Sequence, residues 1–296
     1  MQNLKRILAV TDFSAPADHA LRRAALLAKQ HEAELHLLHV VHPLSLYPGQ
    51  DIDVPALDNA ALGHAGERLG AIAKVLAEHY GIRTHTAWRI GRAHAQIAEY
   101  ARETSADLVV AGARGESTMR RLLLGSTSAR LLRVRSGPTL IVRNTDVQPY
   151  ERVLAAVDFS ADSRIALAWA RCLAGKARLD VVHVLESELD RRLPQDEREN
   201  RDAEMRAIAG NLMSNLLADL PGENTGHVET GYPPARLLEL TETWRTNLVV
   251  LGRHGPDPLA EFLLGSVSKD VAQTTECDVL VTSSVSPEGS VSRPLK

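Results

Sequence analysis

The chain contains one long sequence unit twice. Residues 7–14, ILAVTDFS, recur 146 positions later as residues 153–160, VLAAVDFS. Two further matches follow in the same order, at offsets of 144 and then 140: His39-Val40 with His183-Val184, and Gly112/Gly115 with Gly252/Gly255. This period is far longer than the roughly 20–50 residues of a solenoid repeat. The falling offset indicates duplication of one domain, with a few residues deleted from the second copy.

The length of the chain agrees with two domains. Its 296 residues divide into two copies of ordinary domain size, and 44% hydrophobic with 24% charged residues is typical of globular proteins. We predict domains at residues 1–145 and 150–283, separated by a short polar stretch that contains Pro149. Residues 284–296 are rich in Ser and Pro and are expected to form a flexible tail.

Several classes of protein are disfavoured by composition. A net charge of −3 and 4% aromatic residues give neither the basic surface nor the stacking platforms of a nucleic-acid binder. No apolar run approaches the roughly 18 residues of a membrane span, and the N-terminus lacks a secretory pattern, so a cytoplasmic protein is expected. Two cysteines, Cys172 and Cys277, make no disulfide framework and are expected to serve in packing.

Each copy alternates short β-branched runs with helical patterns, which predicts an α/β domain with a five-stranded parallel sheet. Apolar runs such as residues 108–111 and 248–251 are typical of strands covered on both faces. A helix in the second copy is predicted to bury Met205, Ile208, Ala209, Leu212 and Leu216. In the first copy the predicted strands are Lys5–Val10, Glu34–Val41, Arg83–Trp88, Asp107–Ala111 and Thr139–Arg143.

A spaced set of glycines follows the fourth strand of each copy. Gly112-x-x-Gly115 is followed after nine residues by Gly125-Ser126, and Gly252-x-x-Gly255 after nine residues by Gly265-Ser266. Glycine permits a sharp turn and close approach of a ligand to the backbone. Gly-Ser before the helical patterns at 128–135 and 268–274 is typical of a helix N-terminus, where free N–H groups and the helix dipole favour anions. The pattern predicts a phosphate cradle; the alternative is an inherited loop shape without a ligand.

The spacing resembles the Gly-x2-Gly-x9-Gly-Ser/Thr signature of the ATP-binding branch of the universal stress protein family. The resemblance covers roughly residues 3–143 and 151–283, so the chain is similar to a tandem member. It implies two tandem Rossmann-like domains related to the adenine nucleotide alpha hydrolases, with strand order 3-2-1-4-5. Ligands in such open sheets bind at the carboxyl ends of the strands where the order reverses.

The resemblance also implies site residues, copy by copy. Asp12 and Asp158 would accept hydrogen bonds from the ribose or the adenine side, unless they only cap the following helix. Val40 and Val184 would offer backbone groups to the adenine edge. The phosphates would be held by the glycines together with nearby residues of the two loops: Gly112, Arg114, Gly115, Gly125, Ser126, Thr127 and Ser128, and Gly252, His254, Gly255, Gly265, Ser266, Val267 and Ser268.

The two predicted sites differ in charge. Residues 116–124 contain Arg120 and Arg121 against one Glu, and Arg114 lies between the first pair of glycines. Residues 256–264 contain Asp257 and Glu261, no basic residue and two prolines. A triphosphate is stabilised by cations, so the first site is predicted to bind ATP more tightly, with Mg²⁺ as a further source of charge.

Other chemistry finds no support in the sequence. There is no P-loop and no Gly-x-Gly-x-x-Gly after a strand. His36, His39 and His42 do not suggest a metal site, because His36 and His39 point to opposite faces of a strand. No general base with an acceptor pocket is recognisable, so no catalytic residue is predicted.

We therefore expect a nucleotide-responsive regulatory module in stress response, whose unidentified protein partners recognise a surface that ATP alters. The alternatives are a ligand-free scaffold with degenerate sites, and an ATP-using transferase or slow ATPase. The apolar fifth strands are edges that need cover. They predict pairing of the two domains as a pseudo-dimer within the chain and, as the resemblance implies, a homodimer.

Overall fold

The computed structural model describes residues 4–42, 54–114, 124–134, 137–186, 195–253 and 264–282, with the backbone alone for 54–62 and 195–198. The chain divides into two compact units between Pro149 and Tyr150. We call them the N-terminal unit, Asn3–Pro149, and the C-terminal unit, from Tyr150 onward. Within the described residues, no helix is both long enough and apolar enough to span a membrane.

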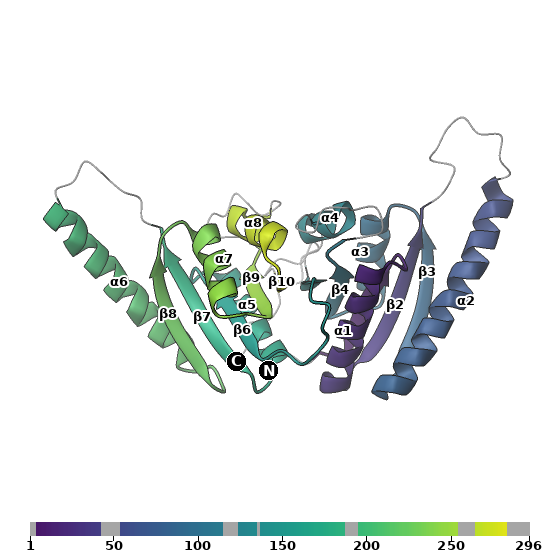
Figure 1. Ribbon diagram of the computed structural model, residues 1–296, viewed down its shortest axis with the longest axis horizontal. Coiled ribbons are helices and arrows are strands. Elements are labelled where there is room, and N and C mark those ends of the chain that lie inside the picture. Colours follow the sequence, from purple (N-terminus) through teal and green to yellow (C-terminus); the bar gives the residue numbers. More distant parts are fainter. Residues whose placement is uncertain are drawn as a thin grey trace. The chain divides into compact units, whose positions relative to one another are not determined.

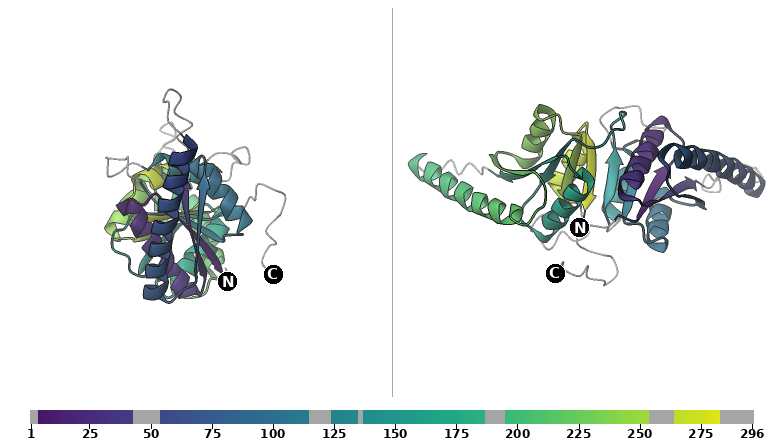
Figure 2. Two further views of the ribbon diagram at one scale, coloured as in Figure 1. Left: turned by 90° about the vertical axis from the view of Figure 1, so that its right-hand side faces the viewer. Right: turned by 90° about the horizontal axis from the view of Figure 1, so that it is seen from below.

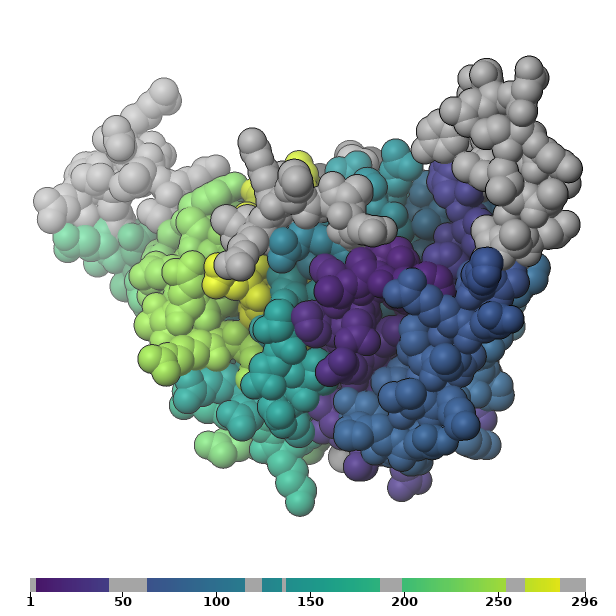
Figure 3. Space-filling model, turned by 45° about the vertical axis from the view of Figure 1, so that its right-hand side comes forward, coloured from purple at the N-terminus to yellow at the C-terminus, as the bar shows by residue number. Residues whose placement is uncertain are grey.

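The N-terminal unit alternates strands and helices. Its elements are β1 (Arg6–Thr11), α1 (Ala15–His31), β2 (Glu34–Val41), α2 (Val54–Tyr80), β3 (Thr84–Ile90), α3 (Ala93–Glu103), β4 (Leu108–Gly112), α4 (Ser126–Val134) and β5 (Thr139–Val142) (Figure 1). The strands are parallel in the order β3-β2-β1-β4-β5, which confirms the predicted 3-2-1-4-5 arrangement. Helices lie on both faces of the sheet (Figure 2), and α1 and α2 lie side by side on one of them (Figure 3).

The C-terminal unit repeats this plan. Its elements are β6 (Arg152–Ala156), α5 (Ala161–Ala174), β7 (Arg178–Leu185), α6 (Gln195–Leu217), β8 (Asn224–Thr230), α7 (Pro233–Thr243), β9 (Leu248–Gly252), α8 (Ser266–Thr274) and β10 (Asp278–Thr282). The parallel order is β8-β7-β6-β9-β10, which is the same order read by copy. The predicted fold class, two five-stranded parallel α/β domains, is confirmed.

The cores follow from the apolar strands. Residues 108–111 and 248–251 are at most 2% exposed, as expected for parallel strands covered by helices on both faces. The two cysteines form no disulfide. Cys277 is buried, and burial raises the pKa of the Cys172 thiol to about 11. The Cys172 thiol therefore lacks the lowered pKa of a reactive thiol.

The predicted buried face of α6 is wrong at three positions. Met205, Ile208 and Leu212 are 43–47% exposed, whereas Ala209 and Met213 are buried. A Cβ placed on Gly226 of β8 would lie 2.6 Å from Met213 Cγ. Met213 thus fills the space that this glycine leaves in the strand, and this contact selects the buried face of the helix.

Candidate functional site

A pocket lies at the carboxyl ends of β1 and β4 in the N-terminal unit, where the strand order reverses. Eight of the nine residues predicted for this copy line it: Asp12, Val40, Gly112, Arg114, Gly125, Ser126, Thr127 and Ser128. The ninth, Gly115, lies outside the described residues, as do Arg120 and Arg121. Six of the other seven lining residues are apolar: Val10, Ala17, Leu38, Ala93, Ile97 and Ala111. The pocket therefore combines an apolar wall with one carboxylate, one guanidinium and a helix N-terminus.

Asp12 organises the turn between β1 and α1. Its Oδ1 accepts hydrogen bonds from Ser14 N at 3.1 Å and from Ser14 Oγ at 2.5 Å. Ser14, not Asp12, is the N-cap, and its Oγ accepts from Ala17 N. Asp158 repeats this arrangement with Ser160, which caps α5. The alternative that the aspartate itself caps the helix is therefore wrong in both copies, although each aspartate supports the cap.

The residue between the aspartate and the serine has an unusual backbone in both copies. Phe13 and Phe159 have φ values of 65° and 64°. Residues other than Gly, Asn and Asp rarely adopt this left-handed backbone conformation. Each phenylalanine ring packs against a histidine of the second strand, with ring centroids 4.3 and 4.5 Å apart. These packed rings hold the strained turn in place, and in both copies the aspartate accepts a hydrogen bond from the backbone N–H of the serine two residues later.

Those histidines, His39 and His183, are positioning residues. From the sequence they were recognised only as matching positions of the two copies, without a role. His39 Nδ1 is 2.8 Å from Thr11 O, and His183 Nδ1 is 2.8 Å from Val157 O. The bonded carbonyl belongs to the residue directly before the aspartate in each case. Each histidine therefore links the end of the first strand to the second strand. This hydrogen bond also fixes the position of the next residue, Val40 or Val184.

Gly112 has a packing role that the sequence did not predict. A Cβ at this position would lie 3.0 Å from Pro16 O and 3.3 Å from Ala17 N, both in the first turn of α1. Gly252 meets the backbone of Asp162 and Ser163 in the same way, at 3.2–3.3 Å. Both glycines are among the described residues, and neither has a positive φ. The space that a Cβ would need is occupied by the first turn of α1 at Gly112 and of α5 at Gly252.

The N-terminus of α4 is held against the end of β4. Ser128 Oγ donates to Gly112 O at 2.7 Å, and Gly125 N donates to Ala113 O at 2.7 Å. The first turn begins at Ser126, two residues earlier than predicted. Since the first N–H groups of a helix have no partner within it, the backbone of this turn presents donors and a positive dipole end to the pocket.

Arg114 supplies a cation beside this helix. It lies directly after Ala113, lines the pocket and is half-buried. Its Nε is buried and has no hydrogen-bond partner among the described residues. A buried donor without a partner is uncommon, and an anionic oxygen in the pocket would satisfy it.

The C-terminal unit repeats much of this geometry. Ser268 Oγ donates to Gly252 O, and Gly265, the N-cap of α8, donates its N–H to Arg253 O at 2.9 Å without a side-chain cap on the helix. Asp158, Val184, Ser266 and Val267 occupy the positions of their counterparts in the first copy. His254 and Gly255 lie outside the described residues.

One difference between the copies lies next to the strand end. Arg253 stands where the first copy has Ala113, and it is 6% exposed. Burial lowers the pKa of its guanidinium, while the charge of Asp162 on α5 opposes that change. Arg253 is therefore buried with an acidic residue nearby, whereas Arg114 lines the pocket.

Fold and site together define a doubly wound α/β protein with a ligand crevice at its switch point. The family model described as "Universal stress protein family" matches residues 3–143 and 149–283. A universal stress protein of Mycolicibacterium smegmatis is 32% identical over 287 residues, covering 93% of this chain and 96% of the relative. The chain therefore belongs to the universal stress protein family, in tandem form, and this membership supports a role in stress response.

One solved structure agrees with this fold over nearly the whole chain. The crystal structure of a universal stress protein from Archaeoglobus fulgidus has a TM-score of 0.70 at 22% identity, covering 96% of this chain and 99% of that one. A further universal stress protein, solved in complex with cAMP, has a TM-score of 0.35 at 25% identity and covers 46% of this chain.

Proposed function

We propose that the protein binds ATP, with Mg²⁺, and acts as a nucleotide-responsive regulatory module. The observation that carries the proposal is the pocket at the switch point, where the Asp12 carboxylate, the Arg114 guanidinium and the N-terminus of α4 face one space. An adenine nucleotide offers matching chemistry, with an apolar base, hydroxyl donors on the ribose and anionic phosphates.

The residues of the pocket fit each part of this ligand. Leu38, Val40 and Ile97 would enclose the base, and Asp12 would accept from the ribose hydroxyls. The N–H groups of Ser126, Thr127 and Ser128, with Arg114, would hold the phosphates. Asp12 is the one carboxylate that lines the described pocket. Mg²⁺ would therefore depend mainly on phosphate oxygens and water, as it does in many nucleotide sites.

The proposal ranks the two copies. Arg114 lines an open pocket, whereas Arg253 is buried near Asp162. We expect the first copy to bind ATP at least tenfold more tightly than the second. Gly115→Val and Gly255→Val test this ranking in separate variants by calorimetric titration. A larger loss of ATP binding from Gly255→Val would reverse it.

The proposed output is regulatory and not catalytic. No general base or acceptor pocket accompanies the described site, so bound ATP is proposed to alter surfaces that protein partners recognise, with any hydrolysis slow. Turnover that appears only with an added acceptor would favour a transferase. Protein purified without nucleotide and showing no thermal shift with ATP would favour a ligand-free scaffold.

The direct experiment measures nucleotide binding. Nucleotide released from the purified protein by acid is identified, and ATP, ADP, AMP and cAMP are titrated in parallel with and without Mg²⁺. We expect Arg114→Gln to weaken ATP binding roughly 10- to 100-fold, because a charge-assisted hydrogen bond is worth about 1.5–3 kcal/mol. Arg22→Gln, at an exposed position of α1, is the matched control and should leave binding unchanged.

The aspartates provide a second matched pair. Asp12→Asn should weaken binding to the first copy, and Asp158→Asn, which changes the same hydrogen-bonded turn of the other copy, should spare it. Equal losses from the two variants would contradict the assignment of the tighter site to the N-terminal unit.

The proposal includes a homodimer. Light scattering should then give twice the chain mass of 32.3 kDa. A mass of one chain at working concentration would reject this part and leave the nucleotide site unaffected.

A further inference from the structure

Three metal-ligating side chains meet at the amino ends of β2 and β3, away from the pocket at the carboxyl ends. Glu34 and His36 are two positions apart on β2 and so share one face of the sheet. His85 of β3 is the register partner of His36. One ligand atom from each of these three side chains lies within 4.8 Å of the other two.

His36 lacks the partners that a half-buried imidazole usually has. Its Nδ1 and Nε2 are both buried, and neither has a hydrogen-bond partner among the described residues. Its ring stacks on His85, with centroids 4.7 Å apart, and makes an edge contact with Tyr100 of α3, with centroids 6.3 Å apart. One of these two ring nitrogens is therefore available to coordinate a metal ion.

Glu34 offers one oxygen to this cluster while the other is already engaged. Its Oε1 lies 3.2 Å from Arg83 Nη1, and its Oε2 lies 3.9 Å from His85 Nε2. Arg83 can thus orient the carboxylate from outside, which is the role of an outer-shell partner in many metal sites. The other nearby cation, Arg6, donates to the Thr104 carbonyl.

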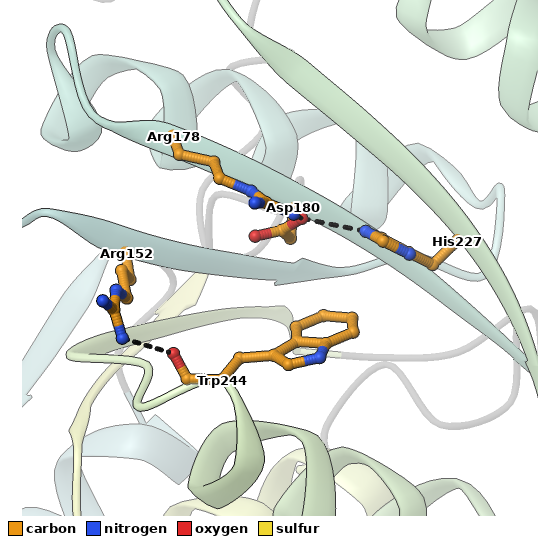
Figure 4. Close-up of polar contacts among 5 residues, drawn as sticks. All are labelled: Arg152, Arg178, Asp180, His227 and Trp244. Carbon is orange, nitrogen blue, oxygen red and sulfur yellow. Dashed lines mark hydrogen bonds and ion pairs between the residues drawn. The ribbon is translucent and has the colours of Figure 1, made fainter.

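The C-terminal unit has different residues at the amino ends of its corresponding strands, β7 and β8. Counting from the matched pair His39 and His183, Asp180 stands where the first copy has His36, and its register partner is Thr225. Asp180 forms ion pairs with Arg178 at 2.9 Å and with His227 at 2.8 Å (Figure 4). The His227 ring packs on Trp244. The backbone carbonyl of Trp244 accepts a hydrogen bond from Arg152 (Figure 4). Here every imidazole and carboxylate has a partner within the protein.

We propose that Glu34, His36 and His85 bind one divalent transition-metal ion of the zinc type. Two imidazoles and a carboxylate suit Zn²⁺ and its neighbours, and not Mg²⁺ or Ca²⁺, which prefer oxygen ligands alone. Ligand atoms around tetrahedral zinc are roughly 3.3 Å apart, so the cluster must contract. The side chain of His85 is 52% exposed and can rotate to do so. Three protein ligands leave a fourth position for water or an external group.

His36, His39 and His42 do not converge on a metal ion, because His39 points to the opposite face of β2 from His36 and its Nδ1 is bonded to the Thr11 carbonyl. The proposed site instead takes its third ligand from the neighbouring strand, and the pairing of His36 with His85 becomes visible only with the sheet register.

The test is zinc binding by the full chain, without an affinity tag and after treatment with chelator. Calorimetry with Zn²⁺ should give one ion per chain, and Co²⁺ should give the visible absorption of a tetrahedral site. His85→Ala should weaken Zn²⁺ binding at least tenfold. His79→Ala, at an exposed position of α2, is the matched control and should change it less than twofold.

Because His85 is exposed, His85→Ala is expected to fold, and circular dichroism checks this. Glu34→Gln and His36→Gln should weaken binding in the same direction. The proposal is overturned if the parent protein binds no Zn²⁺ at 100 micromolar, or if His85→Ala binds it as tightly as the parent.

Discussion

Gly112 shows how one residue can serve both a fold and a site. The missing side chain lets the first turn of α1 approach the end of β4, with Pro16 O only 3.0 Å from where a Cβ would lie. That approach brings the Asp12 turn close to the strand end on which the pocket is built. The duplicated glycine is therefore explained by backbone packing, whether or not both copies hold a ligand.

Gly112→Ala should destabilise the protein by about 1–3 kcal/mol, since the added methyl group meets backbone atoms that cannot move aside cheaply. Gly70→Ala is the control: Gly70 is exposed within α2, and its Cβ would meet nothing within 4 Å. Removing a helical glycine should stabilise by roughly 0.5–1 kcal/mol. Urea unfolding followed by circular dichroism measures both, and equal effects would refute the packing argument.

At the scale of elements, the strands were predicted better than the buried face of α6. The predicted strand Glu34–Val41 matches β2 in full, and Lys5–Val10 differs from β1 by one residue at each end. Buried parallel strands are continuous apolar runs, so their sequences mark them directly. The apolar residues of α6 occur around much of the helix, and only packing against Gly226 selects the buried ones.

Some residues of the candidate site could be predicted from the sequence and others could not. Residues placed directly after strands were found, because parallel strands bring their carboxyl ends together. Ala93 and Ile97 were missed because α3 reaches the pocket only through the tertiary fold. The positive φ of Phe13 could not be predicted either, because local preference opposes it and tertiary contacts of its ring with His39 and Arg68 sustain it.

The revised face of α6 makes a prediction at this scale. Ile208→Lys should change the free energy of unfolding by less than about 0.5 kcal/mol, because the side chain is 47% exposed. Met213→Ala should cost about 2–4 kcal/mol, because it empties space beside β8. Chemical denaturation of the two variants measures both effects. A larger loss from Ile208→Lys than from Met213→Ala would restore the face that the periodicity suggested.

At the scale of the whole molecule, duplication gives each unit its own set of five parallel strands and the buried apolar residues of those strands. Units of this size commonly unfold as separate cooperative domains. We therefore expect two calorimetric transitions. The two packing glycines identify them, since Gly112→Ala should lower the transition of the N-terminal unit and Gly252→Ala that of the C-terminal unit.

With the two transitions assigned, the proposed difference in ATP affinity between the two sites can be measured on the intact chain. A ligand at 100 times its dissociation constant stabilises the unit that binds it by about 2.7 kcal/mol. With Mg²⁺-ATP at a concentration that saturates only the tighter site, the transition lowered by Gly112→Ala should rise and the other should stay within a degree. Because Arg114 lines the pocket while Arg253 is buried, the reverse pattern would place the tighter site in the C-terminal unit. The proposed electrostatic cause would then be wrong, even though nucleotide binding itself had been found.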